Sequence, residues 1–485
     1  MAAPAPVEKP PVTIDTRPLR AILLERMARP GILLLAAVVY WLIASRTPPE
    51  GLSVAGLRAL AVFAVCILLW VTETLPLMVT SMFAMVALPA SGAIETKRAY
   101  GMFGNEAVFF ILGVFILAAC IMKTRLSTRI ALAILHRFGH SPRTLLATVY
   151  LLNAVMSFFM SEHAVAAMNF PIIMEMVRVM RLPRHQSNYA RALFLSMAWG
   201  TTIGGVATLL GGARAPLALG MAREISGESF TFLHWALANL PIVAIMLVVG
   251  WVVINVFFPI DVKSIRAADD LIAERAFALG RMSGREKAVS LVMLATLAGW
   301  IIGGEEYGLA SVALMATVVV FALGLVRWRD VEGYVSWGIL LMYGGAIVLG
   351  AVMNDSGAAG WLSQRTIGRW AVDASGATWI ISGLSIVLTE LLSNSAVVAL
   401  LMPVTLGMCD HLSLEPRVMA LIVAVPAGLG FTLPIGTPSN AIAYSSGYLS
   451  VRDMMIPGII LAVASWLTFN LVARVVWPIL GIHLG

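Results

Sequence analysis

Apolar stretches long enough to cross a lipid bilayer recur along almost the whole chain. Clear examples are residues 105–122, 236–258 and 455–480. A helix needs about 20 apolar residues to span the hydrocarbon core of a membrane, and no stretch of useful domain size separates these runs. Of the 485 residues, 60% are hydrophobic and 12% are charged, against about 25% charged residues in a soluble domain. The sequence therefore predicts an all-α polytopic membrane protein.

The beginning of the chain carries basic residues ahead of the first apolar run. We expect Met1–Pro11, which is rich in proline, to be disordered. The run 31–45 is short enough for a signal peptide, but further apolar segments follow at once and favour an uncleaved first helix. We therefore expect a cytoplasmic N-terminus. The net charge of +7 does not indicate nucleic-acid binding, because the basic residues lie between apolar runs.

Two apolar blocks, 144–177 and 376–409, each hold a serine near the middle. Loops rich in Lys and Arg stay on the cytoplasmic side of a membrane. The basic residues of 123–143 and 178–191 share that side only if 144–177 enters and returns as a re-entrant hairpin. The same rule makes 376–409 a hairpin that enters from the opposite face, and it places the C-terminus outside the cytoplasm. The sequence thus predicts two halves in inverted topology, with broken helices meeting near the midplane.

The two hairpins share one sequence pattern. The stretches "SEHAVAAMNFP" (161–171) and "SNSAVVALLMP" (393–403) both read Ser-x-x-Ala-Val-x-Ala-x-x-x-Pro. A helix that begins at such a serine offers free N–H groups and its positive dipole end to an anion. The half-helix before the break, which carries Ser157 or Thr389 one turn earlier, ends in free carbonyls that suit sodium. We interpret each break as a place where an anion and a cation can be bound together.

Each half has a second break farther along the chain. These are "GGVATLLGGARAP" (204–216) and "FTLPIGTPSNAIAYSSG" (431–447). Clusters of Gly and Pro inside a membrane span indicate unwound backbone. Aligning Gly211 with Gly436 places Arg214 opposite Ser439. Oxygen ligands for a cation are available from Gly436, Thr437, Ser439 and Asn440.

The motif "SNSA" after Thr389, together with "GTPSNAI" (436–442), resembles the Ser-Asn-Thr and Gly-Thr-Pro-x-Asn signatures of the divalent anion/sodium symporters. This family carries dicarboxylates, citrate and sulfate, and the resemblance covers the whole chain. It implies a homodimer in the cell (inner) membrane, sodium as coupling ion and no organic cofactor. It also implies a scaffold domain and a transport domain that moves like an elevator.

The resemblance divides the chain as follows. Residues 1–29 form a cytoplasmic segment, 30–122 scaffold helices, and 123–258 transport elements with the hairpin 144–177 and the broken helix 192–220. The cytoplasmic linker 259–287 leads to scaffold helices in 288–352 and transport elements in 353–480, which hold the hairpin 376–409 and the broken helix 417–444. We expect about eleven transmembrane helices, two re-entrant hairpins and two broken helices.

The resemblance also implies the roles of individual residues. Substrate contacts are expected from Ser161, Glu162, His163, Arg214, Ser393, Asn394, Ser395, Thr437 and Pro438. One sodium ion is expected at Thr389, Ser393, Asn394, Gly436 and Asn440. The matching first site, in degenerate form, consists of Ser157, Ser161 and Gly211.

The first half departs from the family signature. Glu162 and His163 stand where Asn and Thr are usual, Ala215 replaces an Asn, and Arg214 is additional. Because an unpaired charge inside a membrane protein is costly, one hypothesis is that Arg214 pairs with Glu162 in place of the first cation. The alternative is that Arg214 binds a substrate carboxylate. His163 either carries a proton or is a neutral hydrogen-bonded side chain, and Glu390 either pairs or binds a proton.

We expect the import of a small divalent anion, such as a four-carbon dicarboxylate, coupled to sodium. Sulfate-like and tricarboxylate substrates remain open, as do a sodium-independent or proton-coupled exchanger or uniporter, and an anion channel. A serine hydrolase is not expected from Ser161, Glu162 and His163, because adjacent side chains point apart and cannot form a catalytic triad. The sequence predicts a transporter rather than an enzyme.

Overall fold

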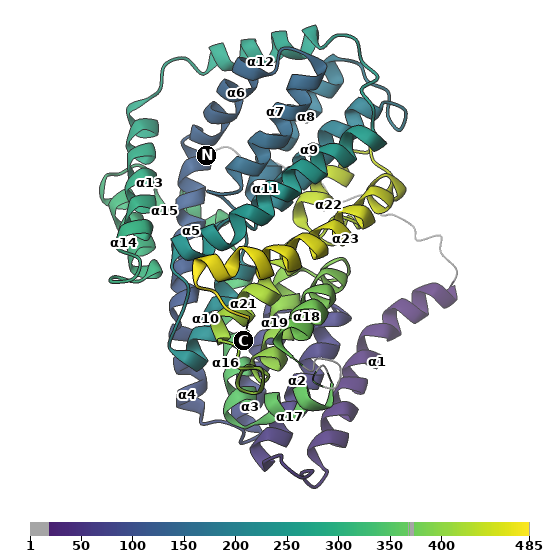
Figure 1. Cartoon of the computed structure of the whole chain (residues 1–485), viewed down its shortest axis with the longest axis vertical. Helices are drawn as coiled ribbons and strands as arrows, with labels where there is room; N and C mark the ends of the chain where they lie inside the picture. The colour runs from purple at the N-terminus through teal and green to yellow at the C-terminus, as the bar shows by residue number, and fades with distance from the viewer. Residues whose placement is uncertain (1–18, 367, 369–372, 485) are drawn as a thin grey trace, which may run out of the picture.

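The computed structural model describes residues 19–366, 368 and 373–484, and these residues form helices and loops without any β-strand (Figure 1). This confirms the predicted all-α class. The first helix, α1, begins at Leu19, ahead of the apolar run 31–45 that predicted it. The proline-rich segment Met1–Pro11 lies outside the described residues.

The helices follow one plan in each half. The first half contains α1 (Leu19–Ala44), α2 (Val54–Val71), α3 (Leu77–Ala90), α4 (Thr96–Gly101), α5 (Glu106–Lys123), α6 (Leu126–Phe138), α7 (Pro142–Met156), α8 (Glu162–Val179), α9 (Asn188–Gly204), α10 (Arg214–Ser226) and α11 (Phe232–Phe257). The linker forms α12 (Arg266–Ala278). The second half contains α13 (Gly284–Ile302), α14 (Leu309–Ala322), α15 (Trp328–Val331), α16 (Trp337–Asp355), α17 (Ala358–Arg365), α18 (Ala374–Thr389), α19 (Asn394–Leu406), α20 (Cys409–Leu412), α21 (Pro416–Ala424), α22 (Pro438–Ser445) and α23 (Val451–Val475).

Five helical segments among the described residues have the length and apolarity to cross a membrane. They are 54–71, 96–123, 232–257, 337–355 and 451–475. Shorter apolar helices include α3, α14, α18 and α19. Several of the shorter helices are halves of broken spans, so the length criterion alone misses them.

Polar caps explain where many of the helices begin. The side chain of an N-cap residue accepts a hydrogen bond from a free N–H of the first turn. This cap is made by Ser53, Asn105, Ser141, Ser161, Ser187, Thr231, Ser283, Ser393 and Ser450. Corresponding helices also share an internal proline, with Pro171 in α8 matching Pro403 in α19. The repeat is therefore visible in local structure as well as in sequence.

Helices of each half pack against helices of the other half. Helix α3 packs against α16 of the other half, and α14 packs against α5. Helix α10 lies on α19 and α21, whereas α22 lies on α8 and α9. Helices α11 and α23 run side by side (Figure 1). The buried core is therefore continuous across the two halves.

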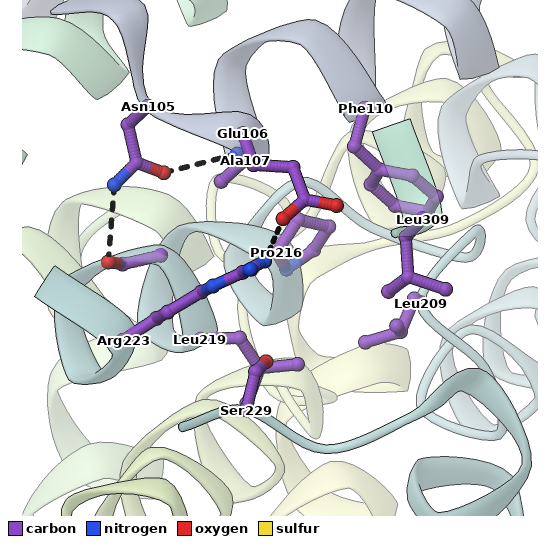
Figure 2. A pocket seen from close by; sticks show the side chains of 11 residues that line it. Asn105, Glu106, Ala107, Phe110, Leu209, Pro216, Leu219, Arg223, Ser229 and Leu309 are labelled. Carbon is purple, nitrogen blue, oxygen red and sulfur yellow. Dashed lines mark hydrogen bonds and ion pairs between the residues drawn. The ribbon is translucent and has the colours of Figure 1, made fainter. Parts of the chain in front are cut away.

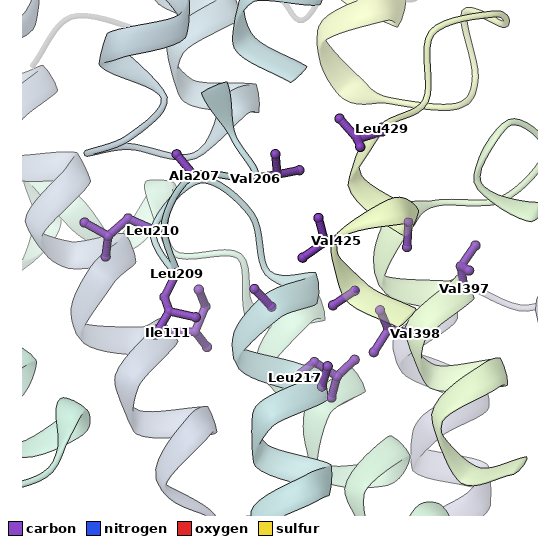
Figure 3. Close-up of a cluster of buried hydrophobic side chains, with 14 of the residues drawn as sticks. Ile111, Val206, Ala207, Leu209, Leu210, Leu217, Val397, Val398, Val425 and Leu429 are labelled. Carbon is purple, nitrogen blue, oxygen red and sulfur yellow. The ribbon is translucent and has the colours of Figure 1, made fainter. Parts of the chain in front are cut away.

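A buried apolar cluster surrounds the helix breaks (Figure 3). It joins α5, the loop 205–213, α10, α19 and the end of α21. Its labelled members are Ile111, Val206, Ala207, Leu209, Leu210, Leu217, Val397, Val398, Val425 and Leu429. The unwound segment 205–213 is thus enclosed by protein, which is the condition under which irregular backbone is tolerated at membrane depth.

The linker between the halves is fixed by Arg129 of α6. Its guanidinium donates to Glu286 Oε1 at 2.8 Å and to the carbonyl oxygens of Gly280 and Leu279 at 2.8 and 3.0 Å. The hydrogen bond from Arg129 lowers the pKa of Glu286 to about 2. Glu286 lies just before the apolar part of α13, so this contact ties the end of α12 to the start of the second half.

Candidate functional site

The two hairpins have nearly identical tips. Ser161 ends the break between α7 and α8, and Ser393 ends the break between α18 and α19. Their backbone angles are φ −61°, ψ 143° and φ −63°, ψ 144°. Ser161 Oγ accepts from the N–H of Ala164 at 3.4 Å, and Ser393 Oγ accepts from Ala396 at 3.3 Å. Both serines are therefore N-caps that direct the start of a helix toward the centre of the protein.

The broken helices supply the other side of the centre. Helices α9 and α10 are separated by residues 205–213, and α21 and α22 by residues 425–437. The carbonyl oxygen of Gly211 accepts from the N–H of Glu162 at 2.9 Å. A Cβ at Gly211 would lie 2.5 Å from Gly205 Cα. Gly205 and Gly211, at the two ends of the loop, can approach each other this closely only because both are glycines.

A chain of buried polar groups joins the two tips. Glu162 Oε1 accepts from Asn394 Nδ2 at 3.1 Å and lies 3.4 Å from Arg214 Nη1. Asn394 Oδ1 in turn accepts from the hydroxyl of Thr389 at 2.8 Å. The side chains of Glu162 and Arg214 are 7% and 2% exposed. The site residues Glu162, Arg214, Asn394 and Thr389, predicted from four separate elements, thus form one continuous cluster.

The side chain of Arg214 lies in a space that Gly212 and Gly428 leave open, which we call the seat of Arg214. A Cβ at Gly428 would overlap its guanidinium, and a Cβ at Gly212 would lie 3.1 Å from its Cζ. The hydroxyl of Tyr343 on α16 donates to the carbonyl oxygen of Ala213, the preceding residue. Arg214 pairs with Glu162 in this structure, in agreement with the first of the two hypotheses about its partner.

Three buried polar atoms of this ion pair and of the predicted first cation site have no hydrogen-bond partner among the described residues. They are Ser157 Oγ, Glu162 Oε2 and Arg214 Nη2. Buried polar atoms in native proteins are nearly always satisfied. The position predicted for the first cation therefore keeps hydrogen-bonding capacity that a water, a proton or a bound solute can use.

The second break has the oxygen atoms that sodium requires. Asn440 Nδ2 donates to the carbonyl oxygens of Gly430 and Leu433 at 3.3 and 3.2 Å, while its Oδ1 is buried without a partner among the described residues. A Cβ at Gly436 would lie 3.1 Å from the carbonyl oxygen of Thr389. Carbonyl and amide oxygens are suitable ligands for a hard cation. The residues present fit a sodium ion.

Glu390 stabilises the loop of this second site. Its carboxylate accepts from the N–H groups of Phe431 at 2.9 Å, Thr432 at 2.9 Å and Leu433 at 3.3 Å. The sequence left open whether Glu390 pairs with a cation or binds a proton. In the structure it accepts hydrogen bonds from three backbone N–H groups.

The predicted site residues differ in exposure. His163 and Pro438 are exposed, and Ser161, Ser393 and Ser395 are half-buried. Glu162, Arg214, Asn394 and Thr437 are buried. The structure thus leaves the side chains of the first group at least partly accessible and buries those of the second group.

The sequence did not predict two further residues of the site, Tyr343 and Gly428. Tyr343 follows Arg214 by 129 positions and lies within an ordinary apolar run. Gly428 contacts Arg214 only because α21 packs against α10. No local sequence pattern indicates contacts of this kind.

Inverted halves with broken helices that meet at a buried polar centre are the architecture of secondary transporters. Comparison with known proteins gives the same class. The family model described as the sodium:sulfate symporter transmembrane region matches residues 27–483. The chain belongs to this family, which confirms the predicted resemblance and identifies a multi-pass membrane transport protein rather than an enzyme.

Similar proteins match most of the chain. A sodium-dependent dicarboxylate transporter, SdcS, of Staphylococcus saprophyticus is 27% identical over 461 residues, covering 90% of this chain and 89% of the relative. SdcS of Staphylococcus aureus is 26% identical over 466 residues, with the same coverage. In fold, the chain is similar to the YdaH transporter of Alcanivorax borkumensis, with a TM-score of 0.52, 16% identity, and coverage of 95% of this chain and 99% of the other.

Proposed function

We propose that this protein imports a small divalent anion, most simply a four-carbon dicarboxylate, together with sodium. The observation that carries the proposal is the meeting of the two hairpin tips through Glu162 and Asn394 at 3.1 Å. This contact brings the N-termini of α8 and α19 together from opposite halves. The relatives named as sodium-dependent dicarboxylate transporters support both the substrate class and the ion.

Two converging helix N-termini suit a solute with a negative charge at each end. The first-turn N–H groups of a helix have no partner within the helix and lie at the positive end of its dipole. The half-buried hydroxyls of Ser161, Ser393 and Ser395 add donors at the same place. Each carboxylate of the substrate is bound at one tip, and His163 lies on the exposed side of the first tip.

We assign one conventional sodium site, with Thr389, Ser393, Asn394, Gly436 and Asn440 as its ligands. At the matching first position, the charge of Arg214 already neutralises Glu162. The positive charge of Arg214 repels a second cation there, and Ser157, Ser161 and Gly211 form only a remnant of a site. Coupling therefore uses fewer sodium ions than two equivalent sites would use.

The proposal also includes movement of the transport elements between the two faces of the membrane. Residues 30–122 and 288–352 form the scaffold, and residues 123–258 together with 353–480 form the transport elements that move as an elevator. The subunits pair as a homodimer. The N-terminus is cytoplasmic and the C-terminus is extracytoplasmic, because this orientation leaves most Lys and Arg residues inside.

A second candidate for the coupling ion is the proton. Glu162 Oε2 is buried without a partner among the described residues, so it can accept a proton. In that case uptake depends on a pH gradient even when sodium is saturating.

Uptake of radiolabelled succinate into proteoliposomes tests the proposal. We expect saturable uptake that needs an inward sodium gradient, with a sodium order of about one. Counterflow with unlabelled substrate distinguishes a carrier from a channel. Uptake that is unchanged when potassium replaces sodium would reject sodium coupling and leave an exchanger, a uniporter or a proton symporter.

A further inference from the structure

The two broken helices have similar sequences but different surroundings. From Arg214 to Ala222, every residue of α10 is buried, and α10 packs against α5 and α16 as well as α19 and α21. Helix α22 packs against α8 and α9 and exposes Pro438, Ala441 and Tyr444. Helix α8 likewise exposes Ala167. The α10 side of the transport elements is thus covered by the scaffold, while the α8–α22 side presents an open face.

Polar contacts fasten the end of α10 to the start of α5 (Figure 2). Glu106, the first residue of α5, forms an ion pair with Arg223 near the end of α10. Asn105, the N-cap of α5, donates through Nδ2 to Glu224 Oε2 at 3.0 Å and to the carbonyl oxygen of Gly220 at 3.4 Å. The other carboxylate oxygen of Glu106 accepts from the N–H of Ala310 on α14 at 3.2 Å.

The interface next to these contacts is tight. A Cβ at Gly220 would lie 2.6 Å from Ala107 Cβ, and a Cβ at Gly350 of α16 would lie 2.5 Å from Met221 Cε. Helix α10 therefore lies directly against two scaffold helices. Sliding of α10 along them requires that the Glu106–Arg223 and Asn105–Glu224 contacts break.

The ion pair is partly exposed. Glu106 and Arg223 line a cavity of about 650 Å³, and the side chain of Arg223 is 47% exposed. An ion pair in contact with water contributes little to stability, and it can open and reform without burying a bare charge. This property suits a contact that has to break in every cycle.

We propose that Glu106 and Arg223, assisted by Asn105 and Glu224, form a latch that holds the transport elements in one end state of the transport cycle. In this state the scaffold covers α10 and α19, and the α8–α22 face is open. The inference rests on the proposed elevator movement. The latch is absent in the opposite end state, so its strength sets the balance between the two states.

The same cavity offers a matched control. Arg417 of α21 lies 3.7 Å from Glu228 in the loop after α10. This pair has similar exposure, with the side chains 32% and 63% exposed. Both of its residues belong to the transport elements, so the pair does not connect them to the scaffold. Replacing Arg417 breaks this pair and its pair with Glu415, which also belongs to the transport elements, without opening the latch.

The experiment measures the accessibility of two engineered cysteines in full-length protein in nanodiscs. Ala167→Cys reports the open face of α8, and Met221→Cys reports the covered face of α10. A membrane-impermeant maleimide is the probe, and the parent chain gives the background from the buried Cys66, Cys120 and Cys409. Each reporter is combined with Glu106→Gln, Arg223→Gln, both together, or Arg417→Gln.

We expect Glu106→Gln and Arg223→Gln each to slow labelling at position 167 and to speed labelling at position 221, by about twofold to fivefold. The double variant should match either single variant, since the two residues act as a pair. Arg417→Gln should label like the parent. The latch is rejected if all labelling rates stay at the parent value, or if Arg417→Gln changes them equally.

Sodium-driven uptake by the parent is measured in parallel. If labelling responds as expected but the parent takes up no dicarboxylate, the proposed substrate fails while the latch stands. Glu106→Gln keeps the acceptor for the N–H of Ala310, so it provides a readout even if Arg223→Gln does not fold.

Discussion

The carboxylate of Glu162 accepts a hydrogen bond from the amide of Asn394, which lies 232 positions farther along the chain, at 3.1 Å. The two residues hold the same place in the two repeats, directly after the N-cap serine of each hairpin. Their contact lies where the two-fold relation between the repeats brings equivalent residues together. The two equivalent positions differ in charge, because Glu162 is an acid and Asn394 is an amide.

The first prediction concerns the charge of Glu162. Glu162→Gln keeps an oxygen acceptor for Asn394 but leaves the buried Arg214 without a counter-ion. Removing one partner of a buried ion pair costs about 3–5 kcal/mol, so we expect a large fall in melting temperature, measured by thermal unfolding in detergent. The double variant Glu162→Gln with Arg214→Met should recover most of the loss. A single variant as stable as the parent would contradict the pairing.

The second prediction concerns ion stoichiometry. The quadruple variant Glu162→Asn, His163→Ser, Arg214→Ser and Ala215→Asn gives these four positions of the first half the residues of the second half. If Arg214 stands in for a cation, removal of its charge restores a place for sodium. The sodium order of uptake should then rise from about one to about two. The same order in variant and parent, with uptake retained, would argue against a substituted site.

The third prediction concerns the seat of Arg214. A Cβ at Gly428 overlaps the guanidinium, so Gly428→Ala should displace Arg214 from Glu162. Overpacking of this kind costs about 1–3 kcal/mol, and we expect lower thermal stability and slower uptake. The control is Gly101→Ala, because a Cβ at Gly101 meets nothing within 4 Å. Equal effects of the two substitutions would show that the seat is not specific.

The fourth prediction concerns pH. Arg129 lowers the pKa of Glu286 from its ordinary value of 4.5 to about 2. The carboxylate therefore stabilises the folded state above about pH 4.5, and this contribution is lost as the pH falls toward 2. Hydrogen bonds to charged groups contribute about 1.5–3 kcal/mol, so Glu286→Gln should melt at a lower temperature than the parent at pH 7.

Melting curves between pH 7 and pH 3 check the pH prediction. The gap between the parent and Glu286→Gln should narrow steadily below about pH 4.5. A gap of constant size over this range would show that the charge of Glu286 does not cause it.

The sequence predicted the helix breaks because they have local signals. Both hairpin breaks are predictable at Ser161 and Ser393, because a capping residue interrupts an apolar run there. The Gly-rich and Pro-rich segments around Gly211 and Gly436 were recognised as unwound for the same reason. The class and the order of the elements follow from such local features.

The contacts that organise the site could not be predicted in this way. The seat at Gly428, the hydroxyl of Tyr343 on the carbonyl of Ala213 and the pair between Glu106 and Arg223 all join segments more than 100 residues apart. Each depends on how helices pack after they have formed. The contacts of Glu390 could not be predicted for the same reason. The three N–H groups that donate to its carboxylate belong to a loop about 40 residues farther along the chain.

The exchange of partners between the halves has a consequence for biogenesis. Helix α10 finds α19 and α21 only after those helices have been synthesised. When the ribosome has added residue 258, the first half lies in the bilayer. Its unwound segment 205–213 is then not fully covered, because the helices of the second half are still missing. Release of a chain truncated there should produce a substrate for quality-control proteases, whereas co-expression of the two halves as separate polypeptides should rescue assembly.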